Sequence, residues 1–235
     1  AMPISAQTVG QKVSGLISLP TDVQSKLYVP LPEGVWQIVS RWDRGSPKSN
    51  VKLTRIYLAQ VKEKELFGLI AIDFNHEIPD SGPDGRSGWA IPRDCTRTNL
   101  FFRWPDASTY FNPRSGYNCL TINHANMTSG KRKKRKDPSY KDAIRWVRKN
   151  TAGLPRVMIV ATFAMSDGAQ MLSVNYFRNP EAEGFPPARE AIRRASEWHY
   201  DRLPGDEKRL AYVTKIKDWA IAWKPRIEAG FRGRE

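Results

Sequence analysis

Hydrophobic and polar residues alternate in the first part of the chain, and this alternation predicts β-hairpins. In residues 27–45, Trp36, Ile38 and Trp42 are separated by polar neighbours, and Gly34 lies in a turn-forming PEG segment. Alternation with a period of two is typical of a strand with one buried face. We therefore expect a strand, a tight turn and a second strand within this segment.

Two further hairpins are predicted from patterns of the same kind. In residues 52–75, apolar side chains share one face of each arm, and the charged KEKE segment between the arms indicates an exposed turn. In residues 156–180, an apolar arm is followed by Asp167 and Gly168, a pair that favours a two-residue hairpin turn. The apolar first arm is suited to a central strand that is buried on both faces.

Helical spacing replaces the alternation in three later segments. After Pro138, apolar residues recur three and four positions apart, which predicts a helix with one buried face. The residues of that face are Tyr140, Ala143, Ile144 and Val147. Two more helices are expected at the C-terminal end, over about 187–200 and about 206–223. Pro225 is expected to end or kink the last of them, because proline lacks the N–H group that a helix interior requires.

Hairpins that come early and helices that come late predict an α+β fold. We expect an antiparallel β-sheet built from hairpins, with helices packed on one face and two helices at the C-terminus. Residues 1–25 are small and polar with scattered aliphatics, and we expect them to form a flexible N-terminal arm. No internal repeat or low-complexity linker divides residues 26–235, so they are expected to form a single α+β domain.

The chain is strongly basic, and one segment concentrates the charge. Among its 235 residues, 38 Lys and Arg stand against 24 Asp and Glu, which gives a net charge of +14. The basic run consists of Lys131, Arg132, Lys133, Lys134, Arg135 and Lys136. Such a run attracts anionic lipid, nucleic acid or another polyanion, but many runs of this kind are only solvated loops. The charge therefore indicates attraction without specifying a partner.

The two cysteines of the chain, Cys95 and Cys119, lie 24 positions apart in one loop-rich segment. Neither belongs to a C-x-x-C pair, and both have polar, turn-like neighbours, which predicts a disulfide; two separate buried thiols are the alternative. A disulfide favours the periplasm or the cell exterior. We expect an export signal upstream of Ala1, with a cytoplasmic location as the alternative, and no apolar stretch approaches the roughly 18 residues of a transmembrane helix.

Arginine and aromatic residues are interleaved between residues 97 and 117, inside a long segment rich in Pro, Gly, Asp and Ser. Aromatic rings beside guanidinium groups are suited to stacking on nucleic-acid bases, and the same rings could hold a sugar or an apolar ligand. The alternative is that about half of the rings pack into the core. The candidate binding residues are Arg97, Phe101, Arg103, Trp104, Tyr110, Arg114 and Tyr117.

Catalytic and metal-binding patterns do not stand out. The histidines His76, His124 and His199 lack the spacing of metal-ligand pairs, and Asp80 and Asp84 lack the cadence of a calcium loop. No phosphate-binding glycine loop and no G-x-S-x-G nucleophile motif occurs. We therefore predict no catalytic residue, no metal ligand and no cofactor, and an enzyme ranks behind a binding protein.

Two motifs are similar to those of a loose family of uncharacterised exported proteins from proteobacteria. The first is LPEGVW at residues 31–36, which starts a strand, and the second is the tail DWAIAWKPRIEAGF at residues 218–231. The resemblance implies export and supplies no catalytic residues.

The function that these observations favour is non-catalytic. We expect a binding or accessory protein of the bacterial cell envelope, whose partner is an envelope protein, an anionic lipid or another polyanion. The alternative is a nucleic-acid-binding protein that uses residues 131–136 and 97–117.

Overall fold

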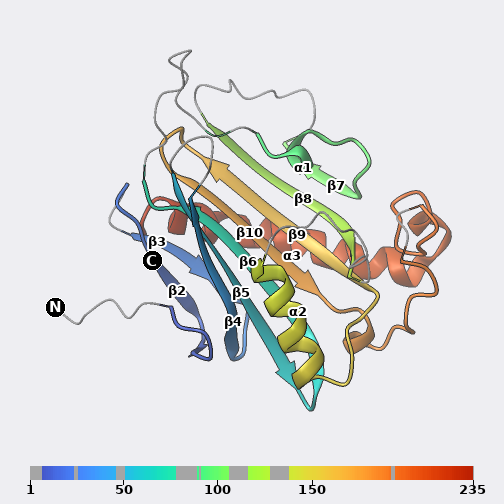
Figure 1. Ribbon diagram of the computed structural model, residues 1–235. Helices are drawn as coiled ribbons and strands as arrows, with labels where there is room; N and C mark the ends of the chain where they lie inside the picture. Colours follow the sequence, from blue (N-terminus) through green and yellow to red (C-terminus); the bar gives the residue numbers. More distant parts are fainter. Residues whose placement is uncertain are drawn as a thin grey trace.

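The computed structural model describes residues 7–23, 26–45, 51–77, 89, 91–105, 116–127, 138–191 and 194–234. Within these ranges, eight strands form one antiparallel sheet in the order β1-β4-β5-β6-β10-β9-β8-β7 (Figure 1). Their bounds are β1 Lys12–Val13, β4 Trp36–Gly45, β5 Lys52–Lys62, β6 Glu65–Asn75, β7 Phe102–Trp104, β8 Tyr117–Asn126, β9 Val157–Ser166 and β10 Met171–Arg178. A smaller sheet pairs β2 (Leu16–Pro20) with β3 (Lys26–Pro30). The predicted α+β class with an antiparallel sheet is confirmed.

The two longer hairpins of the sheet match the predicted ones. Strands β5 and β6 pair through a tight turn at Glu63 and Lys64, whose φ angles of 51° and 64° are those of a two-residue hairpin turn. Strands β9 and β10 pair around the turn at Asp167 and Gly168, where φ of Gly168 is 94°. Local turn chemistry therefore sets the register of the central strands.

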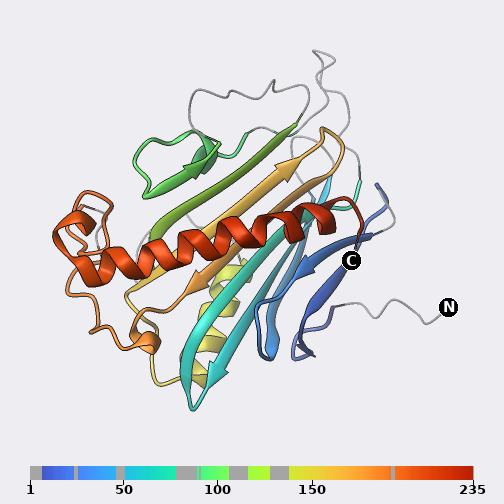
Figure 2. The ribbon, with the colours of Figure 1, turned by 180° about the vertical axis from the view of Figure 1, so that it is seen from behind.

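One face of the sheet packs against the long C-terminal helix α3 (Glu207–Phe231), which crosses it obliquely (Figure 2). The strand residues of this core include Ile56, Leu58, Ile70, Ile72, Phe163 and Val174. Helix α3 buries Val213, Ile216, Ala220 and Ile227 against them. The N-terminal end of the helix is capped by Asp206, whose side chain accepts a hydrogen bond from the backbone N–H of Arg209.

The opposite face packs against helix α2 (Pro138–Asn150), the helix expected after the basic run. Its predicted apolar residues Ala143, Ile144 and Val147 are buried against Tyr57, Leu69 and other residues of the sheet. The helices thus lie on both faces of the sheet rather than on one face as expected (Figures 1 and 2). The physical reason lies in the central strands, because β6 is apolar on both of its faces and each face requires a cover.

The N-terminal segment takes part in both sheets. Within the residues assigned above to an arm, β1 pairs with β4 and β2 pairs with β3. The expected hairpin of residues 27–45 is wrong in its pairing, because β4 pairs with β1 and β5 while β3 pairs with β2. Pro30 and Pro32 bracket the connection and have no N–H to donate to a continuing ladder. The backbone N–H of Leu31 donates instead to the carbonyl of Gly15.

The C-terminal region also differs from the expected pair of helices. The described residues of 187–200 form turns and irregular structure, in which buried Trp198 packs against Phe185 and Tyr212. Helix α3 does not end at Pro225 but continues to Phe231. Pro225 lies on the exposed side, while Ile227 and Gly230 beyond it are buried and Gly230 lies against the backbone of Tyr28 in β3. Tertiary contact therefore outweighs the local signal of the proline.

The predicted disulfide between Cys95 and Cys119 is present, with a Cα–Cα distance of 5.9 Å. It attaches the short helix α1 (Arg93–Thr96) to strand β8 on the α2 face of the sheet. Around the bridge, Tyr117, Cys119 and Ala164 form a small buried cluster with Trp89 and other residues. In the described part of the chain, no helix is long and apolar enough to span a bilayer.

Candidate functional site

A cavity of about 760 Å³ lies on the α2 face of the sheet. Helix α2 covers one side of this face, where it contacts β4 and β5, and the disulfide holds α1 at the other side, over β8. Residues of β6, β10 and β9 between these two covers form the floor of the cavity. Its volume lies within the range of roughly 300–1,000 Å³ that is usual for sites that bind small molecules.

The centre of the floor is polar although the strands that form it are mostly apolar. Cross-strand register places Asn175 of β10 beside Thr162 of β9, and Thr162 beside Thr121 of β8. The Thr162 hydroxyl donates a hydrogen bond to the side-chain oxygen of Asn175 over 2.7 Å. Asn123, two residues further along β8, also lines the cavity. These amide and hydroxyl groups offer both donors and acceptors to a bound molecule.

An ion pair lies on each side of this polar floor. Arg55 of β5 and Asp73 of β6 are directly paired across the two strands, and the Arg55 Nε group donates to the Asp73 carboxylate. On the α1 side, the Arg97 Nη1 group donates to Asp94 over 2.6 Å, and its Nε group donates to Asn99 over 3.0 Å. Each guanidinium in the lining therefore has a carboxylate beside it.

Aromatic and aliphatic side chains complete the walls of the cavity. The rings of Tyr57 on β5 and Tyr140 on α2 meet edge to face, with centroids 6.2 Å apart. Phe177, Leu69 and Ile144 add apolar surface around them. The lining thus combines flat apolar surfaces with a few fixed polar groups, which is the usual composition of a small-molecule site.

Two histidines line one end of the cavity. The rings of His124 and His199 meet edge to face with centroids 5.7 Å apart. His199 is 5% exposed, and its Nδ1 atom accepts a hydrogen bond from the backbone N–H of Asp201 over 3.4 Å. Across the described ranges, no group of three or more His, Cys, Asp or Glu side chains could hold a metal ion.

The candidate residues of the 97–117 segment are divided between the two faces of the sheet. Arg97 lines the cavity. Arg103 helps to hold the backbone of Arg97 in place, because its Nη1 group donates to the Arg97 carbonyl over 2.9 Å. Phe101 packs against the α3 core, and the Lys224 ammonium lies 3.9 Å from the ring centroid of Trp104, which is 43% exposed. Tyr117 is buried beside the disulfide.

The remaining candidates lie outside the described residues: Tyr110, Arg114 and the basic run Lys131–Lys136. The described members alone do not make one continuous Arg/aromatic surface, because Arg97 and Trp104 point to different faces of the sheet.

Sequence reasoning missed most of the cavity lining. The polar floor residues Thr162 and Asn175 lie inside segments that were correctly predicted as strands, but their positions were assigned no role. A signal was present, because a polar residue at an inward position of a central strand is unusual and requires a partner. Arg55 and Asp73 are likewise charged residues within predicted strands, and they lie directly opposite each other on β5 and β6.

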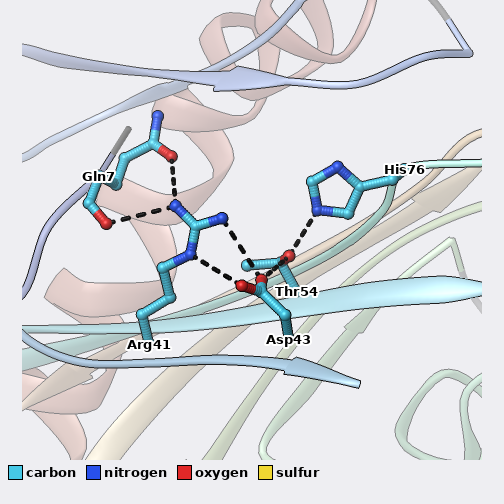
Figure 3. A network of polar contacts seen from close by, with 5 residues as sticks. All are labelled: Gln7, Arg41, Asp43, Thr54 and His76. Carbon is cyan, nitrogen blue, oxygen red and sulfur yellow. Dashed lines mark hydrogen bonds and ion pairs between the residues drawn. The ribbon is translucent and has the colours of Figure 1, made fainter. Parts of the chain in front are cut away.

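A second polar network lies near the ends of β4, β5 and β6 (Figure 3). The Thr54 hydroxyl donates to Asp43 and lies 2.5 Å from the His76 Nε2 atom. Because its single proton is given to Asp43, the hydroxyl accepts from the imidazole. This arrangement differs from a nucleophile–histidine pair, in which the hydroxyl donates to the imidazole. Arg41 joins Asp43 to the backbone and side chain of Gln7, so the network fastens the N-terminal segment to the sheet.

This network predicts that acid destabilises the protein. Burial lowers the pKa of His76 below its usual 6.5, against the opposing attraction of Asp43. Burial raises the pKa of Asp43, but the Thr54 hydrogen bond and Arg41 outweigh it and hold that pKa below 3.8. The unfolded chain therefore takes up protons at His76 as the pH falls from about 6.5 while the folded protein does not, and stability decreases. The Asp43 contribution is full above 3.8 and is lost as the pH falls through its folded pKa.

The measurement is urea unfolding from about pH 7.5 to about pH 4.5, for the natural protein and for His76→Gln. We expect the unfolding free energy of His76→Gln to fall less steeply over this interval. Equal slopes for the two proteins would contradict the assignment of the titration to His76.

The comparisons with known proteins add no relative to this description. No family model, no curated protein and no solved structure matches the chain. The functional argument therefore depends on the cavity itself.

Proposed function

We propose that the protein is a non-catalytic binding protein of the bacterial cell envelope, and that the cavity between α2 and α1 is its ligand site. The observation that carries this proposal is the polar row of Asn175, Thr162 and Thr121 on the floor of a cavity of about 760 Å³. Amide and hydroxyl groups gathered in a cavity of this size are suited to hydrogen-bond a bound molecule, so their presence there supports a binding role.

The pairing of the polar groups supports binding rather than catalysis. Asp73 is held by Arg55, Asp94 is held by Arg97, and the Thr162 hydroxyl donates to Asn175. Each of these carboxylates is already engaged by a guanidinium group. A threonine hydroxyl that donates to an amide has no base to activate it. These groups are suited to fix the orientation of a ligand.

The envelope location is supported by the disulfide and by the sequence resemblance. A structural disulfide is stable in the periplasm or outside the cell and is rare in the reducing cytoplasm. The alternative nucleic-acid function has less support, because the described Arg and aromatic residues of 97–117 are divided between two faces. A partner for the basic run 131–136 is a separate question, and the following experiment includes it.

The proposal is tested by filling the cavity. Ala71 is 4% exposed and lies in the floor, so Ala71→Phe places a ring inside the cavity. The probes are four neutral disaccharides (N,N′-diacetylchitobiose, maltose, cellobiose and trehalose), sodium dodecanoate, an alanyl dipeptide and a 20-nucleotide single-stranded DNA. We expect at least one of the small molecules to shift amide resonances of the cavity residues in NMR spectra, and Ala71→Phe to abolish these shifts.

The matched control is Ala211→Phe, which adds the same ring at an exposed position of α3 and is expected to bind as the natural protein does. Cooperative thermal unfolding of both variants verifies that they fold. The proposal is wrong if none of the small molecules shifts the amide resonances of the cavity residues. DNA binding that is unaffected by Ala71→Phe and falls steeply with salt would instead support the nucleic-acid function.

A further inference from the structure

The lining of the cavity also indicates which class of molecule it accepts. We infer that the ligand is an uncharged, polyhydroxylated molecule of about two sugar rings, such as a disaccharide or the end of a longer glycan. This inference rests on the proposed function, because it names the ligand of the same cavity. It follows from the charge, the hydrogen-bonding groups and the flat apolar surfaces of the lining.

The charge of the lining does not favour an anion. Its two guanidinium groups, Arg55 and Arg97, are accompanied by the carboxylates of Asp73 and Asp94. An anionic ligand would be attracted by each arginine and repelled by the aspartate paired with it. Tight anion sites instead present guanidinium groups directly to the ligand. The positive net charge of the chain, +14, is therefore not concentrated in the lining of this cavity. A cationic ligand would be attracted by each aspartate and repelled by the arginine paired with it.

The hydrogen-bonding groups match hydroxyl groups, each of which donates one bond and accepts others. Asn175 and Asn123 present amides, and Thr162 and Thr121 present hydroxyls, on neighbouring strands of the floor. The Arg97 side chain is 13% exposed, and its Nε and Nη1 groups donate to Asn99 and Asp94, which leaves Nη2 as a further donor within the described part of the structure. An acyl chain over this floor would offer no hydrogen bond to those donors and acceptors that are not already paired with one another, which disfavours its binding.

The walls provide what the non-polar faces of a sugar ring require. A pyranose has flat patches of C–H groups, which pack against aromatic rings while the hydroxyl groups at its edge reach polar side chains. Tyr57 and Tyr140 lie on one side of the polar floor, and Phe177 of β10 belongs to the same hydrophobic cluster and also lines the cavity. Flat apolar surface and planar polar groups are thus available within one cavity whose volume of about 760 Å³ exceeds the size of a single sugar ring.

The inference is tested by titrating the four neutral disaccharides named above, each also in a sulfated form, and dodecanoate. The variant is Asn175→Leu with Thr162→Val, which removes both members of one hydrogen bond and therefore leaves no unpaired partner. We expect a neutral disaccharide to bind, and this variant to weaken its binding by about tenfold or more. The matched control, Asn150→Leu with Thr151→Val, makes the same exchanges at the C-terminal end of α2, outside the cavity lining, and is expected to bind normally.

A second variant covers the case in which the first does not fold. Tyr140→Leu removes an aromatic ring of α2 from the wall and is expected to weaken binding of the disaccharide about fivefold or more. Binding of dodecanoate or of a sulfated disaccharide, without binding of any neutral one, would overturn the ligand class and leave the proposed binding function standing. If no probe at all binds in the cavity, the proposed function fails together with the inference.

Discussion

Replacing both Cys95 and Cys119 with alanine is expected to lower the free energy of unfolding by about 3 kcal/mol and to abolish ligand binding in the cavity. The bridge closes a loop whose ends are 24 residues apart, so its loss enlarges the conformational freedom of the unfolded chain. It also holds α1, whose four residues are too few to form a stable helix alone. Asp94, Arg97 and Asn99 form one wall of the cavity, and they follow α1 when it detaches.

Urea unfolding with and without dithiothreitol separates the bridge from the side chains. The reduced natural protein keeps both sulfur atoms in place, so it should lose most of the same stability, and the variant should not respond to the reductant. Truncation of Cys119, which is 3% exposed, accounts for any remaining difference between the two. Unchanged stability together with unchanged NMR shifts of the bound disaccharide would show that the bridge does not support the site.

The role of the bridge explains why a loop-rich segment takes part in a defined cavity. The floor of the cavity does not depend on the disulfide, because the backbone hydrogen bonds of β10, β9 and β8 fix Asn175, Thr162 and Thr121. The α1 wall has little secondary structure of its own and depends on its link to β8. The binding site thus joins a rigid half to a half that is held by the disulfide, by the short strand β7 and by the hydrogen bond from Arg103 to Arg97.

Those parts of the fold that depend on local chemistry were predictable from the sequence. Asp167 and Gly168 favour a tight turn whatever surrounds them, and the hairpin β9–β10 follows from that preference. Helix α2 was predicted from the spacing of its apolar residues, and Ala143, Ile144 and Val147 are buried as expected. The cysteine pair was predictable because the chain contains only two cysteines, in one segment.

Those parts that depend on distant contacts were not predictable in the same way. The face that each helix covers is set by which strands lie at the centre of the sheet. Helix α3 passes through Pro225 because Gly230 and Ile227 pack beyond it, near β3, and no local pattern contains that information. The cavity was missed for the same reason, because its polar residues come from strands that are far apart in sequence, such as Arg55, Thr121 and Asn175.

The other large expected effect concerns Gly116, which leads into β8. Its φ angle is +96°, and an added Cβ atom would overlap the backbone carbonyl of Ser166, the residue paired with Tyr117. Gly116→Ala thus combines strain of the left-handed backbone with a collision against backbone that cannot rotate away. We expect the free energy of unfolding to fall by about 3 kcal/mol or more, because β8 must shift away from β9. That shift would also displace Cys119, Thr121 and Asn123, and with them the cavity.

Three further glycine-to-alanine variants separate the two causes in urea unfolding experiments. Gly153 has open space around it, so its replacement is expected to change stability by no more than about 0.5 kcal/mol. Gly184 has a φ of +89° and open space, so strain alone should cost about 1 kcal/mol. Gly230 would meet the carbonyl of Tyr28 at an ordinary φ, so collision alone should cost more than Gly184→Ala. If Gly116→Ala is no less stable than Gly184→Ala, the close approach of β8 to Ser166 does not constrain this edge of the site, and the cavity floor is more adaptable than its strand register implies.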